Sequence, residues 1–291
     1  EELNSIIYSN QKLLYDALYR AASATLNELA KDAKYLGANI GYICILHTWG
    51  SAMNYHPHIH TIVLGGGLDD ENKWKETGGK FFLPYGVISK VFRGKYLDEL
   101  KSLWNDSKLK FHGTAEKYQN SYRFKELLDK CYEKNWVTYC KETFNGAQSV
   151  INYLGKYTHR IAISNHRIKS MTDTTVTYAV KDYKNEGHWK EKTISGEEFI
   201  RRFMMHVPPK RFVRIRHYGL LSCRNKRKKI THCRNLLGCK KYISTLKNLN
   251  AVEMIKVLYH IDVCKCSSCG GNMVSPRKDK YSSSFHAHMR C

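Results

Sequence analysis

The chain has 291 residues, and its 48 Lys and Arg against 26 Asp and Glu give a formal net charge of +22. An apolar fraction of 42%, with 12% aromatic residues, is enough for a packed core and excludes a disordered basic tail. No stretch reaches the ~18 apolar residues of a membrane span, so we expect a folded intracellular protein with no membrane partner. Because so large a charge repels itself, phosphate is the expected polyanionic partner, and the many aromatic rings suit single-stranded nucleic acid.

The first half of the chain predicts one helix, three strands and a second helix. Apolar residues at helical spacing predict a long amphipathic helix over residues 5–36, which the glycines at 37 and 41 end. Short apolar runs predict strands over residues 42–46, 58–64 and 81–85. The first two are joined by a short polar connection, which favours antiparallel neighbours, and the second ends at a triple glycine, 65–67. A helix with a basic outer face is expected over 89–103.

The second half alternates strands and helices irregularly. Strands or hairpin pieces are predicted over residues 136–139, 161–164, 167–170 and 175–183, and helices over 145–157 and 195–206. Ser195 and Glu198 form a capping-box pattern at the start of the last helix, and Pro208 and Pro209 follow its end. This mixture indicates an α+β fold with an antiparallel sheet rather than a doubly wound one.

The densest group of candidate metal ligands is the histidine run at residues 56–60. Side chains at i and i+2 share one face of a strand, so His58 and His60 can meet one ion while Ile59 points to the core. His47, at the end of the preceding predicted strand, could supply a third nitrogen. His56 is an alternative third ligand, as is a group from the helix at 145–157, such as Gln148. The cluster predicts a divalent metal site.

A second motif places two phenols one helical turn apart. Tyr153 and Tyr157 stand at i and i+4 on one face of the predicted helix, with Lys156, His159 and Arg160 around them. A free phenol, with a pKa near ~10, is a poor nucleophile, but nearby cations and a metal favour the phenolate. Two tyrosines at this spacing are also typical of ordinary core packing. The pair therefore indicates a nucleophile only in combination with the histidines.

Both motifs resemble the IS91-type transposases, members of the His-hydrophobe-His (HUH) endonucleases. The matching segments read HTWG at 47–50, YHPHIH at 55–60, GGGL at 65–68 and YLGKYTHRIAISN at 153–165. A later segment is similar to the same family, with FIRRF at 199–203 and PPKRFVRIRHYG at 208–219. The resemblance covers roughly residues 5–275.

The resemblance implies a palm of antiparallel sheet flanked by helices and a metal-dependent DNA strand transferase. In that chemistry His58 and His60 hold Mg²⁺ or Mn²⁺, and Tyr153 or Tyr157 attacks single-stranded DNA at an element end or hairpin. The products are a covalent 5′-phosphotyrosine and a free 3′-hydroxyl, as in rolling-circle-like transposition. The implied location is the cytoplasm of a prokaryote, at the nucleoid.

The resemblance also implies a division of the chain. We expect an HUH catalytic domain over residues 1–207 and a basic C-terminal region over 208–291. Family members usually carry a cysteine-rich segment before the catalytic region, so the catalytic domain is expected to be truncated at its N-terminus. That expectation leaves an alternative function, a catalytically impaired single-stranded-DNA-binding or regulatory derivative. A metallohydrolase would explain the histidines alone.

The C-terminal region combines basic and cysteine residues. Arg211, Arg214 and Arg216 alternate with apolar residues, and another Lys/Arg run follows at 224–229, so a DNA track is predicted. Three clustered cysteines, Cys264, Cys266 and Cys269, resemble a zinc knuckle and predict a structural Zn²⁺ site. Two more ligands are needed beyond a C-x-x-C pair, and the candidates are Cys264, Cys233, Cys239, His286, His288 and Cys291.

Overall fold

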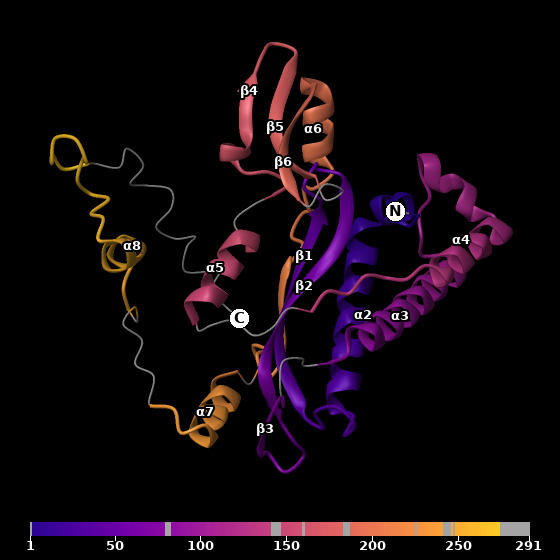
Figure 1. Ribbon diagram of the computed structural model, residues 1–291, viewed down its shortest axis with the longest axis horizontal. Coiled ribbons are helices and arrows are strands. Elements are labelled where there is room, and N and C mark those ends of the chain that lie inside the picture. Colours follow the sequence, from indigo (N-terminus) through magenta and orange to yellow (C-terminus); the bar gives the residue numbers. More distant parts are fainter. Residues whose placement is uncertain are drawn as a thin grey trace. The chain divides into compact units, whose positions relative to one another are not determined.

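A computed structural model describes residues 2–78, 83–140, 147–158, 161–182, 187–224, 226–240, 246 and 248–273. For residues 147, 148 and 156–158 it describes the backbone alone. The chain divides into two compact units, Glu1–Cys233 and Arg234–Cys291. Figure 1 labels their helices and strands.

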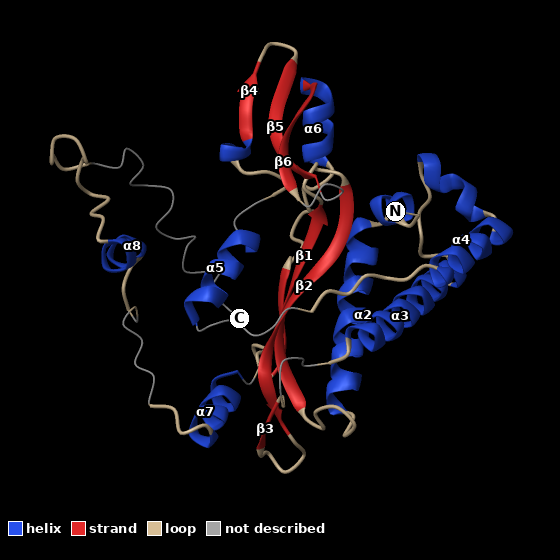
Figure 2. Ribbon diagram, viewed as in Figure 1, coloured by secondary structure: helices blue, strands red, loops and turns tan. Residues whose placement is uncertain are grey.

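The first unit is built on two antiparallel sheets (Figure 2). The larger has the order β3-β2-β1-β7 and consists of β1 (Asn39–Trp49), β2 (Tyr55–Leu68), β3 (Trp74–Glu76) and β7 (Ile215–Gly219). The smaller has the order β4-β5-β6 and consists of β4 (Ile168–Met171), β5 (Thr175–Asp182) and β6 (His188–Ser195). Antiparallel sheets flanked by helices confirm the predicted α+β class.

Four helices lie on one side of the larger sheet (Figure 1). They are α1 (Asn4–Ser9), α2 (Gln11–Lys31), α3 (Tyr85–Asn105) and α4 (Ser121–Glu133). The core lies between them and β1, whose alternate residues Ile40, Tyr42, Cys44 and Leu46 are buried in it. Because successive strand residues point to opposite faces, His47 belongs to the other face of the sheet.

The single helix predicted over 5–36 is interrupted, and Asn10 explains why. Its side chain accepts a hydrogen bond from the Lys110 backbone N–H at 2.7 Å and donates one to the Lys110 carbonyl oxygen at 2.7 Å. The residue leaves helical geometry to make this pair, so α1 ends before it and α2 begins after it. The second helix ends at Lys31 rather than residue 36, followed by Gly37 in the left-handed region.

The predicted end of the second strand is also corrected. β2 runs through the triple glycine to Leu68. A Cβ on Gly66 would lie 2.5 Å from the Lys75 carbonyl oxygen, and one on Gly67 would lie 2.6 Å from that of Asn39. The glycines therefore allow neighbouring strands to pair closely instead of ending the strand.

Three other predicted strands differ from the structure. Residues 161–164 form no strand. The strand over 136–139 is wrong, because Trp136 instead donates from its indole to the Cys131 carbonyl oxygen and packs against the core. Of the strand predicted over 81–85, residues 81 and 82 lie outside the described residues, and Tyr85 begins α3. The helix predicted over 89–103 is confirmed within α3.

The smaller sheet is attached to the loop between β1 and β2. Met53, at the tip of that loop, is buried with Ala162, Tyr178 and Val180. The helix α6 (Gly196–Met204) follows β6, and the predicted cap is present, since Ser195 Oγ accepts from the Glu198 backbone N–H. The helix ends at Met204, two residues earlier than predicted.

The first compact unit extends beyond the domain boundary expected at residue 207. β7 follows that boundary and pairs with β1, so the first compact unit continues to Cys233. The other elements are η1 (Gly113–Gln119), α5 (Ala147–Thr158), η2 (Asn165–Arg167), α7 (Lys226–Leu236) and α8 (Ala251–Tyr259). In the described part of the chain, no helix is long and apolar enough to cross a membrane.

Candidate metal and nucleophile site

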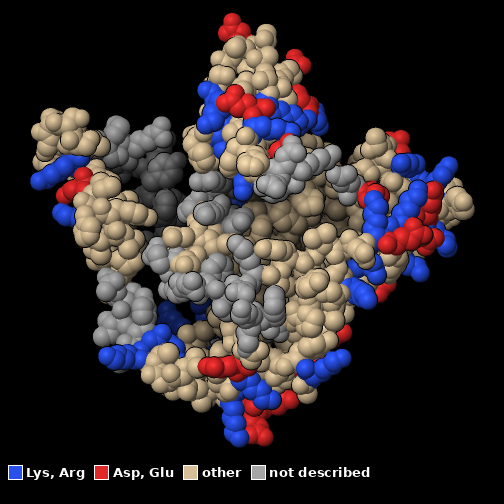
Figure 3. All heavy atoms as spheres, in the orientation of Figure 1, with Lys and Arg blue, Asp and Glu red and all other residues tan. Residues whose placement is uncertain are grey.

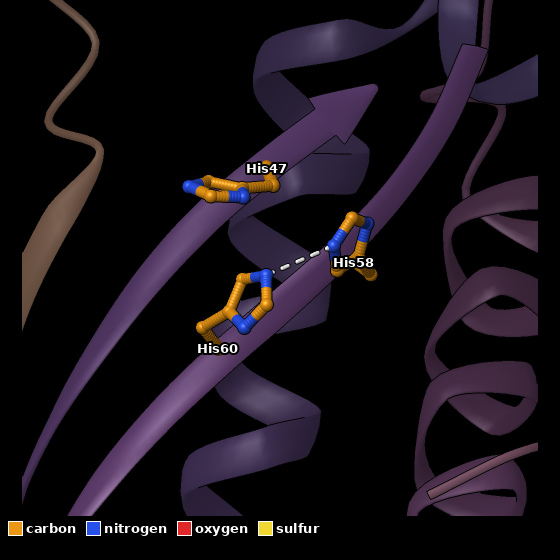
Figure 4. A group of neighbouring side chains, drawn as sticks. All are labelled: His47, His58 and His60. Carbon is orange, nitrogen blue, oxygen red and sulfur yellow. Dashed lines mark hydrogen bonds between the residues drawn. The ribbon is translucent and has the colours of Figure 1, made fainter. Parts of the chain in front are cut away.

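The β1–β2 hairpin brings three histidines together. His47 on β1 lies directly opposite His58 on β2, and Ile45, two residues before His47, lies opposite His60. Between the pairs His47–His58 and Trp49–Tyr55, two residues of β2 lie opposite one residue of β1, so β2 carries a bulge that includes Pro57. Figure 4 shows the three rings gathered on the two strands.

Hydrogen bonds orient the two β2 histidines. His58 donates from Nδ1 to the His56 carbonyl oxygen at 2.7 Å, which leaves its Nε2 as the nitrogen with a lone pair. His58 Nε2 lies 3.1 Å from His60 Nε2. The His47 ring packs edge-on to the His60 ring, with centroids 4.5 Å apart.

This donor set fits a divalent cation. One nitrogen from each of the three rings lies within 4.8 Å of the other two. With metal–nitrogen bonds of about 2.1 Å, two adjacent ligands at a right angle are about 3.0 Å apart, close to the His58–His60 separation. Burial lowers the pKa of His58, and burial with the His58 charge lowers the pKa of His60 to about 4. Both rings are therefore neutral near pH 7, the form that binds metals.

Tyr153 reaches the histidines from α5, on the sheet face opposite α2 and α3 (Figure 1). Its Oη lies 2.9 Å from His60 Nδ1, across 93 positions of sequence. The ring is half-buried. One histidine thus contacts the metal-site nitrogens through Nε2 and the phenol through Nδ1.

The other residues predicted around Tyr153 are largely outside the described part. The side chains of Gln148, Lys156 and Tyr157 belong to helix residues whose backbone alone is described, and His159 and Arg160 lie outside the described residues. His56 is exposed and contributes its carbonyl oxygen to His58, so it is not part of the three-ring group.

The three predicted arginines of the DNA track differ in their surroundings. Arg211 is exposed, whereas Arg214 is half-buried. Arg216 forms an ion pair with Asp16, and its guanidinium lies 4.0 Å from the centre of the Tyr19 ring. Arg216 therefore ties β7 to α2 and has its charge matched within the protein.

Sequence reasoning missed the residues that support the hairpin. Trp49 stacks on His47, with ring centroids 4.5 Å apart and an interplanar angle of 19°. His206 is buried between the strand and the loop, where Nδ1 accepts from the Thr48 hydroxyl at 3.2 Å and Nε2 donates to the Met53 carbonyl oxygen at 3.2 Å. Trp49 could have been found from its i+2 spacing to His47, but no local pattern marks His206.

The clustered cysteines of the second unit form a tight turn. The Cys266 carbonyl oxygen accepts from the Gly270 N–H at 2.9 Å, and the Cys266 N–H donates to the Gly271 carbonyl oxygen at 2.8 Å. Backbone N–H groups of Cys269 and Ser268 lower the pKa of the Cys266 thiol. Among the described residues Cys264, Cys266 and Cys269 are not gathered as a three-ligand group. The predicted ligands His286, His288 and Cys291 lie outside the described residues.

Comparison with known proteins identifies the family. The model of the Y2_Tnp family, described as "Putative transposase", matches residues 41–229, which include the histidines and Tyr153. The chain belongs to this family. The resemblance to IS91-type transposases is thereby confirmed.

Two curated relatives are named transposases. The chain is 40% identical to "Putative transposase y4qJ" of Sinorhizobium fredii over 239 residues, which is 82% of this chain and 60% of the relative. It is 28% identical to "Transposase for insertion sequence element IS801" of Pseudomonas savastanoi pv. phaseolicola over 271 residues, 92% of this chain and 63% of the relative. The chain therefore spans about three fifths of the length of the relatives it matches. No solved structure matches it.

Proposed function

We propose that this Y2_Tnp chain is a transposase that nicks and rejoins single-stranded DNA through a tyrosine nucleophile on an HUH-type palm. The observation that carries the proposal is the bond of 2.9 Å between Tyr153 Oη and His60 Nδ1. It puts a nucleophile beside a three-histidine group in a strongly basic protein.

The divalent cation, Mg²⁺ or Mn²⁺ in the reaction, would be held by His47, His58 and His60. When bound, the cation supplies positive charge that polarises the scissile phosphate and steadies its developing negative charge. Nitrogen ligands alone favour softer ions than Mg²⁺, so Mn²⁺ is the better probe.

The protein's own groups prepare the phenol. With Nε2 turned to the cation site, neutral His60 carries its proton on Nδ1, so Nδ1 donates to Tyr153 Oη, holds it in place and stabilises the phenolate, while the phenol proton leaves to solvent. Attack by Oη on phosphorus forms the Oη–P bond and breaks the P–O3′ bond, and the leaving O3′ takes a proton. The DNA 5′ end is then carried as a phosphotyrosine, and a 3′-hydroxyl that attacks this phosphorus rejoins the strand and releases the phenol. No nucleotide cofactor is needed, because the ester keeps the bond energy.

Tyr153 makes the first cleavage in this scheme, and Tyr157 serves a second strand transfer. The DNA backbone is proposed to be contacted by basic residues. They are Lys156, His159 and Arg160, which follow Tyr153 in the sequence, and Arg211 and Arg214. Hairpin or element-end DNA in the prokaryotic cytoplasm is the proposed partner. The second unit is proposed to hold a structural Zn²⁺.

The test is a covalent-adduct assay. The chain is incubated with a fluorescent single-stranded hairpin and Mn²⁺, and a denaturing gel is examined for a protein band that carries the label. The unmodified chain, and Tyr122→Phe as a control at a tyrosine that is 71% exposed, are expected to form the adduct. Tyr153→Phe and His60→Ala are expected to lose at least ~100-fold in adduct rate.

Other outcomes would overturn the proposal. Cleavage without an adduct would show hydrolysis by an activated water. Binding without cleavage by the unmodified chain would show a regulatory derivative instead of an active transposase.

A further inference from the structure

An open cavity of about 630 Å³ lies at the end of the larger sheet that is far from the histidines. Its floor is apolar and buried, formed by Ile40, Leu68 and Leu220. Asn39 and Ile40 begin β1, whereas His47 stands eight residues further along, a distance of roughly 26 Å at ~3.3 Å per residue. The cavity therefore does not belong to the metal and nucleophile site.

The rim of this cavity is cationic. Lys31 comes from α2, while Lys228 and Lys229 come from α7. Among the described residues none of these three lysines has an ion-pair partner within 4.0 Å. By contrast, the cations of α4 are paired, as in Lys125–Asp129, and Figure 3 shows Lys and Arg interleaved with Asp and Glu over that helix.

The cavity's other polar side chains are those of Asn27, Asn39, Asp69, Asn72 and His232. Asn27 Oδ1 already accepts from the Tyr42 hydroxyl at 3.0 Å, so its amide nitrogen is the group left to donate. The lining contains one carboxylate, Asp69, whose Oδ1 accepts from the backbone N–H groups of Glu71 and Lys73. Lysines and amide groups above an apolar floor suit a ligand that has both a phosphate and a flat apolar body.

The arrangement is built into the fold. Gly219 ends β7 with φ +58°, and a Cβ there would lie 1.8 Å from the Ile40 carbonyl oxygen. This close crossing places Leu220 in the floor, and its N–H donates to the same oxygen at 3.1 Å. His232 Nε2 donates to the Asn72 carbonyl oxygen at 2.9 Å and fixes α7 beside the turn after β2.

We propose that this cavity is a second nucleotide-binding site, which takes one nucleotide of a DNA single strand whose scissile phosphate lies at Tyr153. The lysines hold the phosphate, and the base lies on the apolar floor. This inference rests on the proposed function for the identity of the strand. At ~3.4 Å per stacked nucleotide, the two sites are about 8 nucleotides apart.

The test measures equilibrium binding in EDTA, where no cleavage is required. Fluorescein-labelled oligothymidylates of 4 to 20 nucleotides are titrated with the full chain. We expect the dissociation constant to fall by at least tenfold between about 6 and 12 nucleotides, when a strand becomes long enough to reach both sites. The triple variant Lys31→Ala, Lys228→Ala, Lys229→Ala should lose this step and keep its affinity for the shortest strands. Its slope of log affinity against log salt should be smaller by about 0.7, the value for the one phosphate that the lysines hold.

A matched variant removes the same charge elsewhere. Lys12→Ala, Lys90→Ala, Lys101→Ala changes exposed lysines of α2 and α3 and should keep the step. If both triple variants lose the step equally, or neither does, the proposed site is wrong.

Competition with dTMP and inorganic phosphate tests whether the cavity binds the base. We expect dTMP to displace the long strand at a lower concentration than phosphate does, and equal potency would contradict a nucleotide site. Because the adduct assay is separate, failure here leaves the proposed nucleophile untouched, and the reverse also holds.

Discussion

Tyr153 Oη lies 2.9 Å from His60 Nδ1, although the two residues are 93 positions apart in the sequence. The same imidazole has its Nε2 3.1 Å from His58 Nε2. A single ring therefore joins the proposed nucleophile to the proposed metal ligands. Loss of that ring should affect both binding of a cation and placement of the phenol.

The histidine group predicts a specific order of effects on cation binding. His58→Ala should weaken Mn²⁺ binding by more than about tenfold, because even an outer-shell partner of a metal is worth that much. His56→Ala is the matched control, since it keeps the backbone carbonyl that orients His58. Isothermal titration with Mn²⁺ measures both. Equal affinities for the His58 variant and the unmodified chain would show that the cation binds elsewhere.

His206 predicts a dependence of stability on pH. Burial lowers the pKa of His206 below its usual 6.5, so the native chain disfavours the proton that the unfolded chain accepts. Stability should therefore fall as pH drops below about 6.5, the unfolded value. His206→Gln should cost about 1 kcal/mol at pH 7.5 through its buried hydrogen bonds, and should flatten this decline. Urea unfolding between pH 8 and 5.5 measures the free energy of unfolding. The control is His112→Gln, a change at an exposed histidine, which should keep the same decrease in stability as the unmodified chain.

Two glycines predict opposite changes in stability. Gly219→Ala should destabilise the chain by at least about 2 kcal/mol, because the new Cβ would overlap the Ile40 carbonyl oxygen at a backbone geometry of positive φ. Gly94, inside α3, has open space at its Cβ position, so Gly94→Ala should stabilise by about 0.5–1 kcal/mol. Thermal unfolding of the two variants compares them directly. A stabilising Gly219→Ala would mean that β7 does not pair with β1 in this register.

The proposed structural zinc predicts a stoichiometry. The turn at Cys266 and the backbone donors that favour its thiolate are typical of a C-x-x-C half site. The purified chain should contain one zinc per molecule by elemental analysis, and Cys266→Ser with Cys269→Ser should remove it. Cys223→Ser, at an exposed thiol outside the cluster, should retain the metal. Zinc that stays in the double variant would assign it to another site.

The site was predictable from sequence as far as it depends on local geometry. His58 and His60 share a face because strand side chains alternate, and His47 joins them because a short connection makes β1 and β2 neighbours. Tyr153 was predicted as a nucleophile, but its contact with His60 depends on where α5 packs. No spacing within either segment encodes that position.

The missed features of the fold have the same origin. Asn10 ends α1 through a hydrogen bond to Lys110, and β7 pairs with residues of β1 that lie at least 170 positions earlier. The helical periodicity of the sequence continues through Asn10, so it does not predict the break. It also carries no information on the pairing of β7 with β1. The triple glycine was predicted to end a strand. In the structure the strand continues through it, because the backbones of the neighbouring strands lie too close for a Cβ at Gly66 and Gly67.

Peptide mapping of the DNA adduct identifies the residue that attacks the DNA. Trypsin cuts after Lys156 and so places Tyr153 and Tyr157 on different peptides, residues 142–156 and 157–160. After brief reaction with a single-stranded substrate and Mn²⁺, followed by nuclease and trypsin, mass spectrometry should find the nucleotide on Tyr153 in the 142–156 peptide. A first adduct on any other residue, or no phosphotyrosine in a reaction that has cleaved its DNA, would contradict the assignment of Tyr153 as the nucleophile.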